Sequence, residues 1–149
     1  VERYPEKAKK CQLVLFGDIR DASLLEKIKL KYSHIGRVND QKTLRHLYAM
    51  ASVVLSTSHY ETLGATLIEG QAAGCVPVAF AHDGRKDIID HKINGYIASY
   101  KSPQSIADGI AWAIETSPDR EMLHRSVHDR FASQVIAQKY IKLFQSLIS

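Results

Sequence analysis

Short apolar runs alternate with amphipathic segments along the first hundred residues of the chain. Four runs rich in Val, Ile, Leu and Phe are bounded by Gly, Asp, Ser or Pro, as buried strands are: residues 12–16, 51–56, 76–80 and 95–99. Three segments between them carry apolar residues at helical spacing: residues 21–31, 40–50 and 64–73. A further short strand is expected at His34 and Ile35. Alternating strands and helices predict the α/β class, with a Rossmann-like open parallel sheet flanked by helices.

Beyond residue 100 the pattern predicts a helical C-terminal segment. Pro103 after Ser102 indicates one helix start, Pro118 indicates a second, and Ser133 is placed to cap a third. The apolar face of the last helix is as wide as a packed globular helix needs, so part of it is expected to pack against an amino-terminal partner domain. The opening residues, VERYPEKAKK, have the pattern of an exposed helix end that leads into a strand. We therefore expect residues 1–149 to form a single domain that is a fragment of a longer protein.

Composition supports one globular domain without a membrane span. The chain has 149 residues, 45% hydrophobic and 24% charged, which is enough for a substantial core. No apolar run approaches the roughly 20 residues that cross a bilayer, and the start lacks a signal-peptide pattern, so an intracellular protein is expected. The net charge of +4 is scattered, which mildly favours anionic ligands and offers no basic block for nucleic acid. Cys11 and Cys75 each begin an apolar run and are expected to be small buried hydrophobes.

The polar loop STSHYET marks a candidate ligand site. In an open parallel sheet, ligands bind where loops leave the carboxyl ends of the strands, which places residues 57–64 at the edge of such a site. The backbone N–H groups of Leu63, Gly64 and Ala65 would form a positive helix start able to hold a phosphate. A glycine at a helix start is also commonplace, so Gly64 alone does not separate a phosphate site from an ordinary cap.

Two glutamates, eight positions apart, accompany this loop. Glu69 shares a helical face with Ala65, Ala72 and Ala73, whose small size lets a helix pack tightly on a sheet. A carboxylate there must be satisfied, either by ligand hydroxyls such as those of a ribose, or at the rim by Arg or Lys. Glu61 precedes the helix, where an acid contacts a ligand or simply favours the helix dipole.

Several ordered motifs point to a known family. Glu61 and Glu69 fit an E-x7-E motif, and ETLGATLIEGQAAGCVPVAF resembles the carboxyl-terminal domain of the retaining GT-B glycosyltransferases, the glycosyl transferases group 1 family, whose usual form is close to EGFGLxxLEAMAxGxPVVA. LVLFGD, HIGRV and INGYIA are similar to further family segments, and RFASQVIAQKY resembles the opening of the family's last helix. The resemblance runs from about residue 12 to the end of the chain.

The resemblance implies a donor site for a nucleoside diphosphate sugar. Glu69 would bind the ribose hydroxyls, and Glu61 would contact the donor sugar as the catalytic residue. Leu63 and Gly64 would offer backbone N–H groups to the diphosphate. The remaining residues that the resemblance places in the substrate site are Thr62 beside Glu61, and Gly36, Arg37 and Val38 around the base. Arg37 is equally consistent with an ordinary surface cation.

The chain departs from the family pattern at identifiable positions. Thr62 and Leu63 replace the family's Gly and Phe, and Lys86 and Asp87 replace the Pro-Glu pair that follows its Gly-Gly turn. The family's first strand in this domain, with an Arg and a Lys that clamp the diphosphate, has no counterpart before Val1, and the acceptor-binding amino-terminal domain is missing too.

The expected function is sugar transfer, with retention at the anomeric carbon, to a glycan or lipid-linked acceptor. The resemblance implies neither metal-dependent chemistry nor a cofactor, and the chain alone is expected to be inactive without its own amino-terminal domain. The location is expected to be the cytoplasm, or the inner face of the membrane if the protein associates peripherally with it.

Other functions remain to be weighed against sugar transfer. A non-catalytic nucleotide-binding module of the same fold is the alternative. A receiver domain needs an Asp at the end of a central strand, which VVLST and VPVAF lack, and a dehydrogenase needs G-x-G-x-x-G where LVLFGDIRD has one Gly. His59 and His82 fall in loops at the site face, as acid or base candidates or as solvated side chains.

Overall fold

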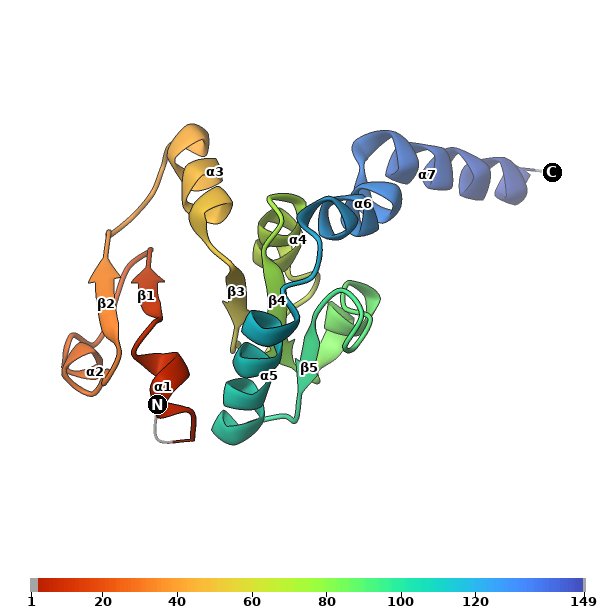
Figure 1. The fold of residues 1–149 in the computed structure, drawn as a ribbon. Coiled ribbons are helices and arrows are strands. Elements are labelled where there is room, and N and C mark those ends of the chain that lie inside the picture. Colours follow the sequence, from red (N-terminus) through yellow and green to blue (C-terminus); the bar gives the residue numbers. More distant parts are fainter. Residues whose placement is uncertain (1–2, 149) are drawn as a thin grey trace.

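Parallel strands pair in two sheets that lie side by side in the computed structural model, which describes residues 3–148 (Figure 1). All pairings are parallel. One sheet contains β1 (Gln12–Leu15) and β2 (Lys31–His34), and the other has the order β3 (Val53–Ser56), β4 (Val76–Phe80), β5 (Tyr96–Ala98). The predicted α/β class with parallel strands is confirmed, and the expected strand at His34 is β2, although its pairing ends before Ile35.

Helices follow the strands, with bounds close to those expected from the sequence. The helical elements are α1 (Pro5–Ala8), α2 (Ser23–Glu26), α3 (Gln41–Met50), α4 (Ala65–Ala72), the 3-10 helix η1 (Asp83–Asp87), α5 (Pro103–Thr116), α6 (Arg120–Phe131) and α7 (Ser133–Ile148). The helix predicted at 21–31 is wrong in length, because α2 has four residues and β2 already begins at Lys31.

Helix starts depend on capping side chains. Asp40 accepts hydrogen bonds from the backbone N–H groups of Lys42 at 3.2 Å and Thr43 at 2.7 Å. The hydrogen bond from the Thr43 hydroxyl, and then these two backbone bonds, lower the pKa of the Asp40 carboxyl. Ser102 caps α5 as predicted. Asp119, the residue after Pro118, caps α6.

The core surrounds β4, which is buried at all five positions. Val76, Val78 and Phe80 belong to the cluster that packs with α5, whereas Ala79 belongs to the cluster that packs with α3, α4 and α6. This alternation is the period of two expected of a strand between two layers. Helices therefore cover both faces of the β3–β4–β5 sheet.

Close packing of α4 on the sheet depends on Gly70. A Cβ built on Gly70 would lie 2.7 Å from Cγ1 of Val54 in β3, which is far inside van der Waals contact. The buried residues of α4 are Leu67, Gly70 and Gln71. The helix thus faces the sheet through residues 67, 70 and 71, and this orientation sets where its other side chains point.

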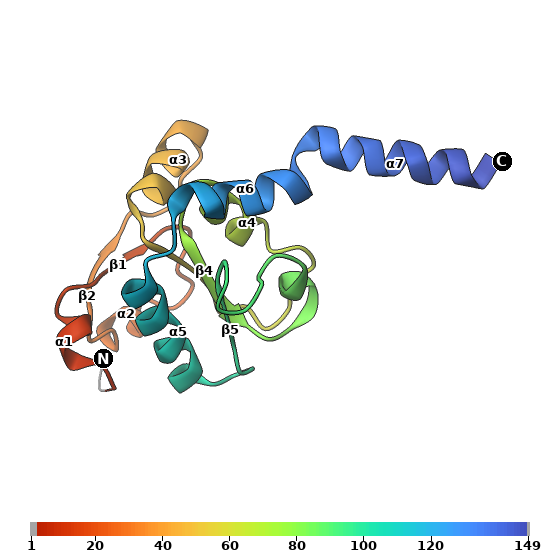
Figure 2. The ribbon, with the colours of Figure 1, turned by 45° about the vertical axis from the view of Figure 1, so that its right-hand side comes forward.

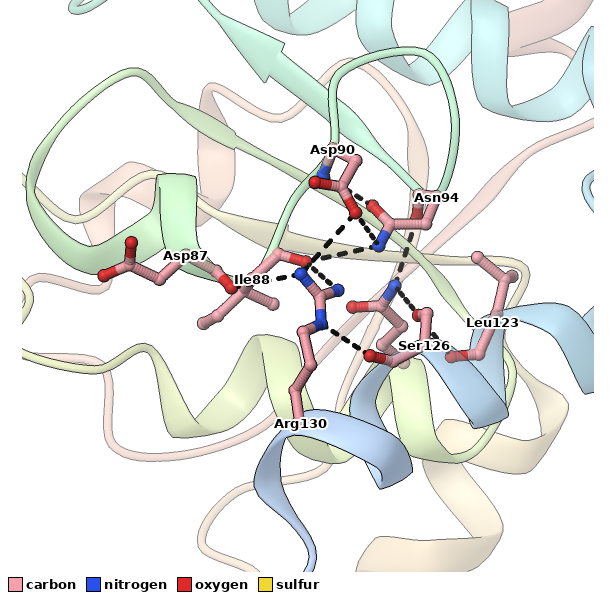
Figure 3. A network of polar contacts seen from close by, with 8 residues as sticks. Asp87, Ile88, Asp90, Asn94, Leu123, Ser126 and Arg130 are labelled. Atoms are coloured by element: carbon pink, nitrogen blue, oxygen red, sulfur yellow. Dashed lines mark hydrogen bonds and ion pairs between the residues drawn. The ribbon is translucent and has the colours of Figure 1, made fainter. Parts of the chain in front are cut away.

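A polar network fixes the segment after η1 against α6 and α4 (Figure 3). Nη2 of Arg130 donates to the carbonyl of Ile88 at 2.8 Å, and Nδ2 of Asn94 donates to the same carbonyl at 3.3 Å. Nε2 of Gln71 donates to the carbonyl of Asn94 at 3.3 Å and to Oγ of Ser126 at 2.9 Å. The network holds the β4–β5 connection against α6 and against Gln71, near the carboxyl end of α4.

Helix α7 extends away from the rest of the molecule in both views (Figures 1 and 2). None of its described residues is buried, and Tyr140, Phe144 and Leu147 are 57%, 60% and 72% exposed. Over residues 3–148, no helix combines the length and the apolar character that a membrane crossing requires.

Candidate functional site

The loop between β3 and α4 lies at the carboxyl end of the central sheet, as its sequence predicts. Gly64 is the N-cap of α4 and has the left-handed backbone angles φ 74° and ψ 46°. A Cβ at Gly64 would be strained and would lie 3.3 Å from Cδ1 of Ile88. Backbone conformation and packing are sufficient to explain this glycine. Its presence therefore supports a tight helix start and does not by itself demonstrate a phosphate site.

Glu61 and Thr62 are held between α4 and η1. The side chain of Glu61 is half-buried, and its Cγ would lie 3.7 Å from a Cβ built on Gly64. A Cβ on Gly84 would lie 2.7 Å from the carbonyl oxygen of Thr62, so η1 packs directly against the backbone of the loop. Leu63 is 50% exposed. Glu61 thus lies beside the start of α4, and η1 packs against the backbone of the loop that carries it.

Glu69 lies at the exposed rim of α4. The prediction that it shares the packed face of the helix is wrong, because that face is made by Leu67, Gly70 and Gln71. The hydroxyl of Tyr48 in α3 donates to Oε2 of Glu69 at 3.2 Å. Burial of Tyr48, and then the negative charge of Glu69, raise the pKa of the Tyr48 hydroxyl. It therefore stays protonated and orients the carboxylate, where an Arg or Lys partner was the expected alternative.

A cleft of about 720 Å³ opens beside Glu69, between α4 and the α6–α7 region. Its lining is largely apolar, with Glu69 and Lys139 as its charged residues. The complete lining is Leu63, Ala65, Ile68, Glu69, Phe131, Ile136, Lys139, Tyr140 and Leu143. A ligand that used Glu69 would therefore meet apolar surface on one side and the start of α4 on the other.

Gly36, Arg37 and Val38 lie in the other half of the molecule, after β2. The carbonyl of Gly36 accepts a hydrogen bond from the N–H of Gly17 at 2.8 Å, which joins the loops that follow β1 and β2. Arg37 is exposed and Val38 is half-buried. Within the described residues, none of these three forms a hydrogen bond or ion pair with residues 57–69. The structure brings Glu61 to Gly64 together with Glu69 on one loop and helix, whereas the 36–38 loop follows a strand of the other sheet.

An aromatic cluster lies at the same edge, and the sequence predicted only the place of its two histidines, His59 and His82. The ring of Tyr100 lies 4.8 Å from that of His82 and 5.9 Å from that of His59, and Tyr60 lies 5.8 Å from His82, all centroid to centroid. His59 is exposed and His82 is half-buried among these rings. Each of these residues closely follows the end of β3, β4 or β5, and this shared position was the signal available in the sequence.

Arg85 was not predicted from the sequence either. Its side chain is 0% exposed, and Nη2 donates to the carbonyl of Ser58 at 2.7 Å. An arginine in a polar loop predicts a solvated cation, so nothing in the sequence pattern marks this one as buried.

Comparison with known proteins decides the family. The glycosyl transferases group 1 model matches residues 1–129. The chain belongs to this family. An uncharacterized glycosyltransferase of Methanocaldococcus jannaschii is 31% identical, over 87% of this chain and 35% of the relative. The GDP-Man:Man(3)GlcNAc(2)-PP-Dol alpha-1,2-mannosyltransferase of Dictyostelium discoideum is 28% identical, over 100% of this chain and 33% of the relative.

Solved structures agree on the fold of this group 1 family member. HepE of Anabaena, in complex with UDP, superposes with a TM-score of 0.77 at 20% identity, over 92% of this chain and 41% of HepE. At this identity the likeness establishes the GT-B fold. The chain spans about a third of the length of the two curated relatives.

Proposed function

We propose that this chain is the nucleotide-sugar-binding, carboxyl-terminal domain of a retaining glycosyltransferase. The full-length enzyme would transfer a sugar from a nucleoside diphosphate sugar to a glycan or lipid-linked acceptor. Family membership and the UDP-bound neighbour of the same fold support this proposal. The observation that carries it is the single unit formed by the 61–64 loop and α4. Glu61 lies at the helix start, and Glu69 is exposed on the same helix with its carboxylate held by Tyr48.

Each residue of the unit has a chemical role in the proposal. The carboxylate of Glu69 accepts hydrogen bonds from the ribose hydroxyls, and backbone N–H groups at Leu63 and Gly64 meet the diphosphate at the positive end of α4. Glu61 orients the donor sugar, with Thr62 fixing the loop through its carbonyl. Gly36, Arg37 and Val38 contact the base from the neighbouring sheet.

Catalysis in the proposal is electrostatic. The transition state of sugar transfer carries positive charge on the sugar ring and negative charge on the leaving diphosphate. Groups already in place at these two positions stabilise that separation without reorganising. The amino terminus of α4 faces the leaving group, and the half-buried carboxylate of Glu61 faces the sugar. The acceptor would be bound by the amino-terminal domain, and further cations for the diphosphate would come from the family's first strand of this domain, so no turnover is expected from residues 1–149 alone.

Titration calorimetry of the full-length protein with UDP, GDP and ADP sugars tests the donor site. One of the three is expected to bind. Glu69→Gln should lower the affinity for that donor about tenfold, because hydrogen bonds to a charged carboxylate are lost. Glu61→Gln should leave the donor affinity within about threefold and lower kcat by about a hundredfold or more. Glu115→Gln, which removes an exposed carboxylate from α5, is the matched control. Absence of binding by all three donors would contradict the proposal.

A non-catalytic nucleotide-binding module of the same fold is the second candidate, favoured by Thr62 and Leu63 at positions where the family pattern has Gly and Phe. Under this alternative the donor still binds, but transfer by the full-length protein is unchanged when Glu61 and Glu69 are both replaced by Gln.

Retention is tested by a separate measurement. Proton NMR of the first product formed would show whether the anomeric configuration of the donor is retained.

A further inference from the structure

Arg85 joins the ends of two strands beneath the 57–64 loop. Its Nη2 donates to the carbonyl of Ser58, which follows β3, at 2.7 Å, and its Nη1 donates to the carbonyl of Phe80, which ends β4, at 3.4 Å. The side chain is fully buried. One guanidinium thus bridges the carboxyl ends of both strands from which the site loops emerge.

No side chain that the structure describes forms an ion pair with Arg85. Its hydrogen-bond acceptors are two neutral carbonyls, and its buried Nε has no partner among the described residues. A guanidinium does not lose its proton in a protein, and a buried charge without an opposite charge costs several kcal/mol. An anion bound nearby would therefore lower the cost of burying this cation.

The segment that carries Arg85 packs directly on the candidate site. Gly84, on one side of Arg85, contacts the carbonyl of Thr62, and Ile88, three residues after Arg85, packs against Gly64. The carbonyl of Arg85 accepts the N–H of Ile88 at 3.1 Å, which sets the spacing of these two contacts. Arg85 therefore lies under the stretch that runs from Ser58 to the amino terminus of α4.

We propose that Arg85 is a positioning residue of the donor site, with two effects. It holds the 57–64 loop through the Ser58 carbonyl, and its buried positive charge strengthens binding of the donor's diphosphate at the start of α4. A charge in the protein interior is screened less than one at the surface, so it acts on an anion that it does not touch. This inference rests on the proposed function of the site.

Charge dependence of ligand binding separates this role from a merely structural one. The full-length protein is titrated with the nucleoside diphosphate of the donor that binds, and with the corresponding uncharged nucleoside. Arg85→Met removes the charge and keeps much of the volume. We expect this variant to bind the nucleoside diphosphate at least tenfold more weakly than the wild type, and to change the affinity for the nucleoside less than twofold.

Arg120→Met is the matched control for loss of a carbonyl-binding arginine. Arg120 donates to the carbonyls of Ala51 at 3.2 Å, Ala49 at 2.9 Å and Ala73 at 2.7 Å, near the opposite, amino-terminal end of β3. Both affinities should stay within twofold of the wild type in this variant, whatever its thermal unfolding temperature.

Arg85→Lys keeps the charge but cannot hold two carbonyls in the fixed geometry of a guanidinium. Its diphosphate affinity should stay within threefold of the wild type, while kcat falls at least fivefold because the loop that carries Glu61 is less well held. This variant decides the question if Arg85→Met does not fold, and wild-type values for both quantities would then overturn the inference.

Three results have different meanings. A wild-type protein that binds no nucleoside diphosphate contradicts the proposed function itself, and with it this inference. A wild type that binds, with Arg85→Met equally tight for the diphosphate, overturns the role of Arg85 alone. Equal losses for diphosphate and nucleoside in Arg85→Met also overturn it, because they show that the side chain acts only on the shape of the site.

Discussion

The two sheets of this molecule differ sharply in how far they are buried. In the β3–β4–β5 sheet, β4 is buried throughout and helices cover both faces. In the β1–β2 sheet, the strands are exposed or half-buried, and no described residue before Tyr48 is buried. Parallel sheets depend on cover for both faces. The same α/β pattern in one sequence therefore produces one sheet with a complete core and one without.

This difference divides the candidate site. Glu61, Gly64 and Glu69 rest on the well-packed sheet, whereas the 36–38 loop follows the poorly covered β2. Tyr48 connects the two halves, because its hydroxyl bonds Glu69 and its ring lies 6.0 Å from that of Phe16, edge to face. In the proposed donor site, the contacts to sugar, ribose and phosphate would thus rest on the well-packed sheet. The pocket for the nucleobase would rest on the less well-packed one.

We expect the largest loss of stability from a change in the core of the packed half, which is the β3–β4–β5 sheet with the helices that cover it. Leu67 is 0% exposed in α4, so Leu67→Ala should lower the free energy of unfolding by about 3 kcal/mol through lost burial and a cavity. Leu25→Ala, at a half-buried position in α2, should cost about 1 kcal/mol. Urea denaturation of both variants measures the difference, and equal losses would show that the two halves are stabilised alike.

Alkaline pH should weaken the same half by about 2 kcal/mol. Burial raises the pKa of the Cys75 thiol to about 11, so the folded state holds this proton more tightly than the unfolded state. Its contribution is complete below about pH 9 and is lost as the pH rises toward 11. The pKa of the Tyr48 hydroxyl is also raised, so its contribution to stability is likewise lost as the pH rises.

Unfolding free energies measured from pH 8 to 11 test this dependence. Cys75→Ala should flatten the decline relative to wild type, whereas Cys11→Ala, in the exposed half, should leave the slope as it is. A slope that is identical in all three proteins would refute the assignment to Cys75.

The hydrogen bond of Tyr48 to Glu69, which connects the two halves, should contribute less to the free energy of unfolding. Tyr48→Phe keeps the ring contact with Phe16 and removes the hydrogen bond to Glu69, so it should cost about 1 kcal/mol in stability. The donor should also bind about threefold more weakly, because the carboxylate of Glu69 is no longer oriented. Chemical denaturation and calorimetry check the two values, and tighter donor binding would show that Tyr48 competes with the ribose.

The smallest effect is expected where the amino-terminal end attaches to α5. The hydroxyl of Tyr4 donates to Oδ1 of Asp108 at 2.7 Å in a partly exposed position. Tyr4→Phe should therefore change the free energy of unfolding by about 0.5 kcal/mol. A loss comparable to that of Leu67→Ala, in the same denaturation assay, would mean that this contact stabilises the exposed half far more than its surroundings suggest.

Local patterns predicted the elements of the packed half well. The apolar run VPVAF and the helix start at Ser102 and Pro103 are patterns that act over a few residues, so sequence alone is sufficient to place them. The loop that carries Glu61 and Gly64 was found for the same reason, since it follows a strand and opens a helix.

Properties that depend on tertiary packing were not predictable in this way. The side of α4 that faces the sheet is set by the contact of Gly70 with Val54, which lies in a different element far from Gly70 in the sequence. This contact turns Glu69 outward. The burial of Arg85 likewise depends on carbonyls at Ser58 and Phe80, and no local pattern encodes it. Sequence identified the candidate loop, and only the fold revealed the buried arginine that packs against it.

The two free cysteines, Cys11 and Cys75, provide one natural chemical probe in each half of the molecule. Cys11 is half-buried just before β1, whereas Cys75 is fully buried just before β4, with its Sγ 3.0 Å from the carbonyl of Tyr48. A thiol reagent can reach Cys75 only when the core opens, and Cys11 only needs local motion near β1. Labelling rates of the unmodified protein, followed by mass spectrometry, would therefore time the opening of each sheet separately, without any introduced reporter.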